Sequence, residues 1–276
     1  MKNLAQGYIP REMIAKGKTK EIWTTDDADI INARATNDIT AGDGAKHDTF
    51  AGKAVFANQT TCNVFKFLQG HGIPLAFIAQ YDAVSFLAKH CEMISYEIVI
   101  RRKAWGSYLK RHPLIPKGFE FADPKVEFYL KTTGKQWNGI ILPVDDPLIV
   151  FEDGVAKLFR PDMPLDGQEP FMILTDYPLR GWPSERKVME WIAEQIFIAL
   201  ENKWRSLDYQ LVDLKIEFGK DLDGNIVVAD VIDNDSWRVL TKEGEHLDKQ
   251  IYRDGGNLDD VAAKYRKVME LTDKFN

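Results

Sequence analysis

The most regular alternation of apolar and polar residues falls between residues 211 and 238. Leu211–Phe218 alternates with a period of two, which is typical of a β-strand that buries one face. The turn residues Asp223-Gly224-Asn225 tolerate a positive φ angle, so Ile226–Asp233 is predicted to return as the second strand of a β-hairpin. The apolar face of the first strand carries Val212, Leu214, Ile216 and Phe218, and the polar face carries Asp213, Lys215 and Glu217.

The register of this hairpin decides the surroundings of Asp230, because a slip of one residue turns every side chain of a strand to the opposite face. One register buries Asp230 among apolar side chains, where an unpaired carboxylate costs several kcal/mol. The other register places Asp230 beside Asp213, Lys215 and Glu217, and we expect this one. Carboxylates so close together repel each other unless a cation lies between them. Because all the candidate ligands are oxygens, they favour Mg²⁺ held by one or two carboxylates and by substrate phosphates.

A solvated sheet face with surface ion pairs is the alternative explanation, and three alternating charges alone would favour it. Asp230 and the dense polar run Asp233–Arg238 favour a binding site instead. An EF-hand is excluded, because Ile226 stands where that loop requires glycine.

Helical periodicity predicts three longer elements, and shorter apolar runs predict strands. Lys117–Arg180 has no clear period, and a loop-rich segment of this length is usually functional or mobile. The predicted helices are Lys53–Gln69, Ser184–Arg205 and Leu258–Phe275. The inward face of the second helix is predicted to carry Val188, Trp191, Ile192, Ile196, Ala199 and Leu200.

Two glycine-containing segments near the N-terminus do not complete known nucleotide motifs. Glu12 stands where a P-loop needs its first glycine, so Ile14–Thr24 is predicted to be a strand pair bent at Gly17. Its lysines, Lys16, Lys18 and Lys20, would project from one face and bind phosphate only if that face covers a nucleotide. In Asn37–Lys46 a dinucleotide loop lacks its third glycine. A mobile loop bearing Asp43 and Lys46 and an inert surface turn explain that segment equally well.

A predicted strand, Tyr96–Arg101, is followed by a short helix that begins near Ser107. A serine at a helix N-terminus is ordinarily only a cap. Because arginines lie beside it, we favour an anion pocket of N–H groups, a hydroxyl and a guanidinium that binds phosphate through two hydrogen bonds.

The composition indicates a globular protein of one large domain or two lobes, with 276 residues, 45% apolar and 28% charged. The net charge of −6 gives no support for a nucleic-acid partner. No apolar run reaches the roughly 18–20 residues of a membrane span, and residues 1–10 lack the apolar core of a signal peptide. Cys62 and Cys91 have no metal-like spacing, so we expect reduced thiols and a cytoplasmic location.

Taken together, these motifs resemble the SAICAR synthetase family (phosphoribosylaminoimidazole-succinocarboxamide synthase). The resemblance implies a two-lobed α+β fold related to ATP-grasp, with antiparallel sheets and flanking helices. The implied lobes are residues 1–95, which would cover ATP, and residues 96–276, which would hold the metal and substrate site. The stretches that carry the resemblance are Gly17–Glu21, Ile39–Lys46, Arg101–Arg111, Leu211–Gly219, Ala229–Arg238 and Asp248–Asp254.

The implied reaction joins carboxyaminoimidazole ribonucleotide (CAIR) to L-aspartate in de novo purine biosynthesis and converts ATP to ADP and phosphate. A carboxylate is a poor acyl donor, and transfer of the γ-phosphoryl group of ATP gives it a leaving group. That step needs positioning and charge neutralisation more than a protein nucleophile. We therefore expect an acyl phosphate intermediate, with ATP and Mg²⁺ as cofactors and with no nucleic-acid or membrane partner.

The resemblance also implies roles for individual residues. Glu217 and Asp230 would bind Mg²⁺, and Asp213 and Lys215 would face the reacting carboxylate as the catalytic pair. The residues implied to meet the nucleotide are Lys18, Lys20 and Lys131, with Met93 at the adenine. The candidates for binding the substrates are Arg101, Ser107 and Arg238 for the CAIR phosphate, with Asp43, Asp233, Ser236, Lys249 and Arg253 as further contacts.

The sequence departs from the family pattern after Lys131, where Thr132-Thr133 stand in place of acidic or amide residues and Asp146-Pro147 follows only after an insertion. Two other functions compete with the implied one. Another ATP-dependent ligase or small-molecule kinase would keep the lysines and Glu217 with Asp230, but not the phosphate-binding set. An inactive nucleotide sensor would not need to retain Lys18, Glu217 and Asp230 together. A protein kinase is disfavoured, because His-Arg-Asp and Asp-Phe-Gly are both absent.

Overall fold

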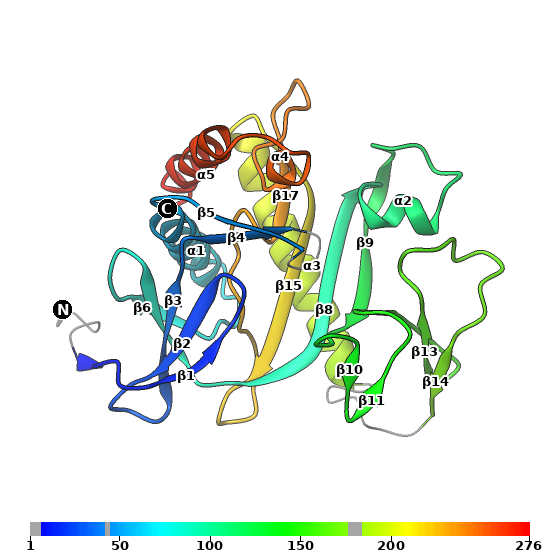
Figure 1. The fold of residues 1–276 in the computed structure, drawn as a ribbon, viewed down its shortest axis with the longest axis horizontal. Coiled ribbons are helices and arrows are strands. Elements are labelled where there is room, and N and C mark those ends of the chain that lie inside the picture. The colour runs from blue at the N-terminus through cyan, green and yellow to red at the C-terminus, as the bar shows by residue number, and fades with distance from the viewer. Residues whose placement is uncertain (1–6, 42–44, 176–183) are drawn as a thin grey trace. The chain divides into compact units, whose positions relative to one another are not determined.

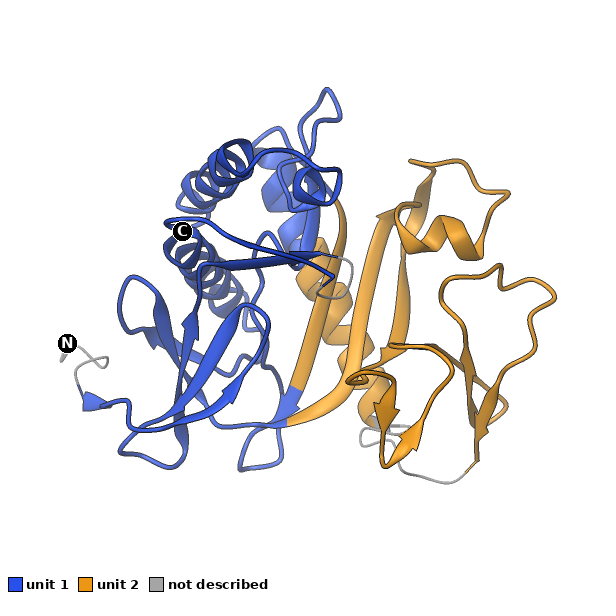
Figure 2. Ribbon diagram, viewed as in Figure 1, with its two compact units in different colours: residues 1–92, 199–211, 219–276 blue, residues 93–198, 212–218 orange. Residues whose placement is uncertain are grey.

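The computed structural model describes residues 7–41, 45–175 and 184–276. Antiparallel sheets and a few helices make up the chain, as predicted (Figure 1). Two compact units are present (Figure 2): unit 1 comprises residues 1–92, 199–211 and 219–276, and unit 2 comprises residues 93–198 and 212–218. The chain first leaves unit 1 close to the predicted boundary at residue 95. The predicted lobes are continuous in sequence, whereas these units are not, and the functional division into lobes remains a prediction.

Unit 1 contains a five-stranded antiparallel sheet in the order β1-β2-β3-β7-β6. Lys18 lies in the bend between the first two strands, while Lys16 and Lys20 lie on different strands. The predicted strand pair at Gly17 is therefore confirmed, but the predicted row of three lysines along one face is wrong. The strands are β1 (Met13–Lys16), β2 (Lys20–Thr24), β3 (Ile30–Ala35), β6 (Phe77–Gln80) and β7 (Ser85–Lys89).

The long helix α1 (Lys53–Gly70) packs against β3, β6 and β7 and against α5 (Leu258–Thr272). In Figure 1, α1 and α5 lie side by side. Cys62, Phe65 and Leu68 of α1 are buried. The start of α5 is capped by Asn257, whose side chain accepts a hydrogen bond from the backbone N–H of Asp260.

Two small elements cover another part of unit 1. The hairpin β4 (Asp38–Ala41) and β5 (Lys46–Thr49) pairs Asp38 with Thr49, and the short helix α4 (Gln250–Arg253) follows later in the chain. Lys46 joins them, because its Nζ donates to the backbone oxygen of Tyr252 at 2.9 Å. Ile39, Phe50, Tyr252, Val261 and Tyr265 form the buried cluster beneath these elements.

The sheet of unit 2 has the strand order β14-β13-β12-β9-β8-β15. The segment Lys117–Arg180, which has no clear period in the sequence, thus supplies most of the strands of this sheet. A short helix, α2 (Ser107–Arg111), follows β8 as predicted. The strands are β8 (Glu92–Lys103), β9 (Glu120–Leu130), β12 (Leu148–Glu152), β13 (Val155–Phe159), β14 (Met172–Leu174) and β15 (Gln210–Lys220), and a separate hairpin is formed by β10 (Gln136–Trp137) and β11 (Ile140–Ile141).

The hairpin predicted around residue 224 is confirmed, with a shorter return strand than expected. Gly224 has a φ angle of 80° in the turn, and β16 (Ile226–Val228) pairs with β15. The next strand, β17 (Trp237–Leu240), begins only after an irregular segment. Because β16 ends at Val228, Asp230 lies outside the ladder, and strand alternation does not determine where its side chain points.

The helix predicted at residue 184 is α3 (Ser184–Ser206). Ile192, Ile196 and Leu200 are buried on it, but Val188 and Trp191 are 45% and 58% exposed. The predicted inward face is thus wrong at its N-terminal end. The buried stripe follows Met189, Ile192 and Ala193 instead, which is a rotation of about one residue around the helix. No helix in the described part of the chain is long and apolar enough to cross a membrane.

Close packing at Gly219 on β15 gives a testable prediction about stability. A Cβ at this position would lie 2.8 Å from the Cβ of Cys91 and 3.2 Å from the Cβ of Ala229. Gly219→Ala is expected to lower the free energy of unfolding by about 1–3 kcal/mol, because overpacked sites force their neighbours to shift. Urea denaturation followed by tryptophan fluorescence measures this change.

Gly70→Ala is the matched control, because a Cβ at Gly70 would meet no atom within 4 Å. Its free energy of unfolding should stay unchanged or rise by up to about 1 kcal/mol. Equal stability of the two variants would show that the close contact at Gly219 is not a constraint on the fold.

Candidate functional site

Charged side chains gather on one face of the sheet of unit 2, here called the polar face. Strand alternation places Asp213, Lys215 and Glu217 of β15 on this face, opposite the buried Val212, Leu214 and Ile216. The polar face itself is also largely buried, since Asp213 is 4% and Glu217 is 2% exposed. Charges at such positions are tolerated only when counter-charges and hydrogen bonds surround them. The alternative of a solvated strand face is therefore wrong.

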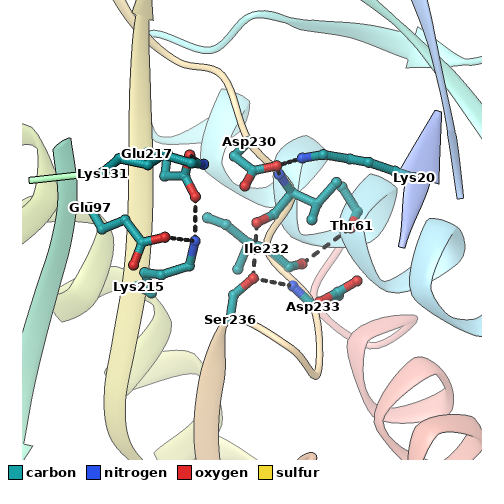
Figure 3. Close-up of polar contacts among 11 residues, drawn as sticks. Lys20, Thr61, Glu97, Lys131, Lys215, Glu217, Asp230, Ile232, Asp233 and Ser236 are labelled. Carbon is teal, nitrogen blue, oxygen red and sulfur yellow. Dashed lines mark hydrogen bonds and ion pairs between the residues drawn. The ribbon is translucent and has the colours of Figure 1, made fainter. Parts of the chain in front are cut away.

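Lys215 lies at the centre of one cluster on the polar face (Figure 3). Its Nζ donates to Glu97 Oε1 at 3.3 Å and also contacts Glu217. The other oxygen of Glu217 contacts Lys131. Burial lowers the pKa of Lys215, but Glu217 and Glu97 outweigh this effect and leave the pKa raised. Lys215 is therefore held as a cation between two carboxylates, and Lys131, Lys215 and Glu217 are brought together.

Arg101 forms a second cluster on the same face. Its Nη1 donates to Asp213 Oδ2 at 2.8 Å, its Nε donates to Glu127 Oε2 at 2.6 Å, and its Nη2 lies 3.4 Å from the hydroxyl of Ser107. The side chain of Arg101 is 3% exposed. The predicted neighbours Arg101 and Ser107 are thus within hydrogen-bonding distance, and Asp213 joins them. Glu127 was not predicted from the sequence, because a single acidic residue in a segment without a clear period carries no signal of its own.

Thr132, next to Lys131, is bonded to two acids that lie further along the chain. The backbone N–H of Thr132 donates to Asp146 Oδ1 at 2.8 Å, and the backbone N–H of Asp146 donates to Thr132 Oγ1 at 3.0 Å. Thr132 Oγ1 also donates to Asp145 at 2.9 Å. The residues at which the sequence departs from the expected family pattern therefore meet in space, although 14 positions separate them along the chain.

In unit 1, Lys20 forms an ion pair with Asp230 (Figure 3). Lys20 projects from β2 and Asp230 from the irregular segment after β16, and their side chains are 28% and 16% exposed. A hollow of unit 1 lies beside them. It is lined by residues that include Lys20, Lys53, Thr61 and Asp233.

The run Asp233–Ser236 forms a tight turn in unit 1. The backbone N–H of Asp235 donates to Asp233 Oδ1 at 2.8 Å, and the backbone N–H of Asp233 donates to the hydroxyl of Ser236 at 3.4 Å. That hydroxyl donates onward to the backbone oxygen of Val231 at 3.0 Å (Figure 3). The predicted site residues Asp233 and Ser236 are therefore adjacent, and their own hydrogen bonds hold the turn.

Asp235 is the charged centre of this turn. Its carboxylate lies 3.3 Å from Lys53 Nζ and 3.4 Å from Lys249 Nζ, and the hydroxyl of Tyr265 donates to it at 2.5 Å. Lys53 and Tyr265 were not predicted from the sequence to be site residues. Lys53 is 1% exposed in the first turn of α1. The signal that could have identified it is the presence of a lysine at an inward position of a predicted helix.

The two acids of the turn have opposite pKa shifts. Burial and the neighbouring Asp235 raise the pKa of Asp233 to about 6. Burial also raises the pKa of Asp235, but the cations Lys53 and Lys249 outweigh it, so its pKa is lowered. Burial lowers the pKa of Lys249, and Asp235 opposes that shift. As the pH falls through about 6, Asp233 therefore takes up a proton while Asp235 stays ionised.

The remaining predicted residues are more scattered. Met93 is 44% exposed near the start of β8, and Arg238 lies on β17 between the buried Trp237 and Val239. Arg253 ends α4, where its Nη1 donates to Gln250 Oε1 at 3.3 Å. Asp43 lies outside the described residues. Lys18 lies in the bend between β1 and β2.

Within the described ranges, no group of three or more His, Cys, Asp or Glu side chains is placed to hold a metal ion. Glu217 belongs to unit 2 and Asp230 to unit 1. Both offer hard carboxylate oxygens, and each already contacts a lysine. This donor chemistry fits Mg²⁺, which binds through one or two carboxylates and takes its other ligands from water and phosphate.

Comparison with known proteins gives the same family as the motifs. The family model described as SAICAR synthetase matches residues 13–141 and 179–272. The phosphoribosylaminoimidazole-succinocarboxamide synthase of Chloroflexus aggregans is 38% identical over 272 residues, which cover 96% of each chain. The bifunctional phosphoribosylaminoimidazole carboxylase/phosphoribosylaminoimidazole succinocarboxamide synthetase of Drosophila melanogaster is 36% identical over 94% of this chain and 54% of its own length.

A solved structure, a SAICAR synthetase (Type-2) in complex with ADP, superposes with a TM-score of 0.75. It is 30% identical, and the match covers 95% of this chain and 97% of that chain. The predicted α+β fold class is thereby confirmed. Because the family model matches most of the chain and relatives above 30% identity match nearly all of it, the chain belongs to the SAICAR synthetase family, whose members are ligases.

Proposed function

We propose that this chain is an ATP-dependent ligase that joins CAIR and L-aspartate to give SAICAR, ADP and phosphate in purine biosynthesis. The single observation that carries the proposal is the buried polar face of unit 2. There Lys215 is held between Glu97 and Glu217, while Arg101 lies beside Ser107. The structural neighbour solved with ADP supports the use of ATP. A reaction mixture in which ADP release requires both CAIR and aspartate tests the assignment.

The nucleotide is proposed to bind through Lys18, Lys20, Lys131 and Met93. Lys20 and Lys131 are each in contact with a carboxylate, Asp230 and Glu217 respectively. Each lysine is thus already held close to an acid that we propose as a Mg²⁺ ligand. Such pairs suit a site that binds phosphates together with a metal ion, because the lysine contacts the phosphates and the acid binds the metal ion.

Glu217 and Asp230 are proposed to hold Mg²⁺, which when bound would neutralise charge on the transferring phosphoryl group. The side chains of the protein are proposed to neutralise further charge and to orient the reacting groups. Lys215 is a fixed cation, and we propose that it faces the carboxylate of CAIR and offsets the negative charge that develops there. Asp213, fixed by Arg101 at 2.8 Å, is proposed to orient the reacting groups beside it.

The proposed chemistry has two steps. A carboxylate oxygen of CAIR attacks the γ-phosphorus of ATP, and the bond from that phosphorus to ADP breaks. The amine of aspartate then attacks the acyl carbon and loses a proton, and inorganic phosphate leaves with the oxygen that came from CAIR. Neither step requires a covalent bond to the protein, which agrees with the absence of a Ser-His-Asp or Cys-His motif from the sequence.

The substrate-binding set is proposed to comprise Arg101, Ser107 and Arg238 for the phosphate of CAIR, with further contacts from Asp43, Asp233, Ser236, Lys249 and Arg253. The contact between Arg101 and Ser107 favours CAIR as the substrate. Another ligase or kinase, whose substrate carries no nucleotide phosphate, would not need this pair. An inactive sensor would bind ATP without turnover. A cytoplasmic location and the lack of a nucleic-acid partner remain predictions from composition.

The metal assignment predicts a specific change in Mg²⁺ dependence. Glu217→Gln removes one charged ligand, so the Mg²⁺ concentration for half-maximal activity should rise about ten- to a hundredfold, with a fall in turnover. Titration of activity with Mg²⁺ measures this shift. Glu97→Gln is the control, because it removes the other acid that contacts Lys215 without removing a proposed metal ligand. A Mg²⁺ dependence that is the same in wild type and Glu217→Gln would refute the assignment.

The phosphate assignment predicts a selective loss of CAIR affinity. Arg238→Ala should raise the KM for CAIR about ten- to a hundredfold, because a charge-assisted hydrogen bond is lost, while the KM for ATP changes little. Arg205→Ala, which removes an exposed arginine paired with Glu201 at 3.7 Å, should leave both constants unchanged. An equal rise in both constants for Arg238→Ala would count against a dedicated phosphate contact.

The acyl phosphate predicts the fate of an isotopic label. CAIR carrying ¹⁸O in its carboxylate should deliver one labelled oxygen to inorganic phosphate, because that oxygen leaves with the phosphoryl group. Mass spectrometry of the released phosphate detects it. Direct attack by the amine, with ATP hydrolysed separately by water, would leave the phosphate unlabelled and would exclude the intermediate while keeping the substrates.

A further inference from the structure

Glu127 lies between two buried arginines in unit 2. Its Oε2 accepts a hydrogen bond from Arg101 Nε at 2.6 Å, and its Oε1 contacts Arg111 Nη2. The hydroxyl of Tyr129 also donates to Oε2, at 3.2 Å. Both oxygens of this carboxylate are therefore engaged. We call Arg101, Glu127 and Arg111 the arginine clamp.

Sheet geometry explains why Glu127 reaches Arg101. Glu127 of β9 is paired directly with Val99 of β8, and Arg101 lies two residues further along β8. Residues two apart on a strand share a face, so Glu127 and Arg101 are diagonal neighbours on the polar face. Long side chains bridge the ~7–8 Å that separates such positions. The register of this strand pair thus fixes the contact.

The clamp closes a ring through Ser107. Arg111 Nη1 donates to the backbone oxygen of Ser107 at 3.1 Å and to that of Pro161 at 3.3 Å. Arg101 Nη2 lies 3.4 Å from the hydroxyl of the same serine. Glu127 therefore links the guanidinium of Arg101 to the backbone that carries the Ser107 hydroxyl, and the distance between these two groups depends on it.

The clamp is almost fully desolvated. The side chains of Arg101, Glu127 and Arg111 are 3%, 11% and 0% exposed. Burial raises the pKa of Glu127, but the two arginines outweigh it, so the pKa is lowered and the group is ionised. A buried ion network of this kind is often no more stabilising than apolar side chains of the same volume. Stability alone therefore does not explain why charged residues occupy these positions. A need to fix the orientation of the Arg101 guanidinium does explain it.

From this geometry we infer that Glu127 is a positioning residue for substrate binding. Together with Arg111, it sets the plane of the Arg101 guanidinium relative to the Ser107 hydroxyl, so that both donors meet one phosphate monoester. This inference rests on the proposed function, in which Arg101 and Ser107 bind the phosphate of a ribonucleotide. A guanidinium recognises phosphate through a planar fork of two N–H donors. Small rotations of that plane weaken binding, and the groups that lock it therefore contribute to affinity.

Glu127→Asp is the test, because it keeps the charge but shortens the side chain by one methylene, so that the carboxylate no longer bridges both arginines. The KM for CAIR is expected to rise about tenfold, the effect of one lost charge-assisted hydrogen bond. The KM values for ATP and aspartate and the value of kcat should stay within about twofold. An unchanged KM for CAIR would overturn the inference.

Phe128→Leu is the matched control for general loosening of β9. Phe128 is 4% exposed and lies on the opposite face of the strand, with its ring centroid 5.3 Å from that of Phe151. Its truncation should lower the melting temperature and leave the KM for CAIR unchanged. A similar rise of this KM in Phe128→Leu would show that β9 acts only through stability and would overturn the positioning role.

A double-mutant cycle with Arg101→Lys tests whether Glu127 acts through Arg101. Lysine has no guanidinium plane to orient, so adding Glu127→Asp to Arg101→Lys should raise the KM for CAIR by less than twofold. A further tenfold rise in that background would mean that the two residues act independently, against the inference.

Arg111→Lys provides a second route if Glu127→Asp does not fold. It keeps the buried charge but loses the fork that joins Glu127 to the backbone of Ser107, so the KM for CAIR should again rise selectively. An unchanged KM would overturn the inference.

The proposed function fails separately, if the wild-type chain forms no product from CAIR, aspartate and ATP. Wild-type turnover with unaltered CAIR affinity in both variants would reject the positioning role alone.

Discussion

A buried charge needs a counter-charge, and this requirement organises the polar face of unit 2. β15 is covered on both faces, so Asp213 and Glu217 are almost completely removed from water. Neither carboxylate would be tolerated there alone. Arg101 satisfies the first, and Lys215 and Lys131 satisfy the second. The positions of the cations are thus consequences of where the acids are buried.

The same requirement shapes the turn that follows β16 in unit 1. Asp235 gathers Lys53, Lys249 and the hydroxyl of Tyr265 around one carboxylate. These partners come from α1, from the segment before α4 and from α5. One charge therefore ties three parts of unit 1 to the turn. Of the two acids in this turn, Asp233 is the one with the raised pKa, because burial and the neighbouring Asp235 disfavour its anionic form.

The segment after Lys131 is held in place by local hydrogen bonds. The family model does not match residues 142–178, which contain β12, β13 and β14 at one edge of the sheet of unit 2. Thr132, in the matched part, and Asp146, in the unmatched part, exchange backbone and side-chain hydrogen bonds. These strands therefore extend the sheet away from β15.

Local sequence patterns are sufficient to predict the hairpin at Gly224, the three long helices and the family, because short-range periodicity, turn chemistry and motif spacing do not depend on distant residues. They placed Val188 on the wrong side of α3, because a period identifies a stripe only to within about one residue of rotation. Only the tertiary structure decided which charges meet. Lys53 and Asp235 are 182 positions apart, and the contact of Glu127 with Arg101 depends on the register of two strands. No local pattern encodes such pairings, since each residue alone is compatible with a solvated surface, and only burial makes its partner necessary.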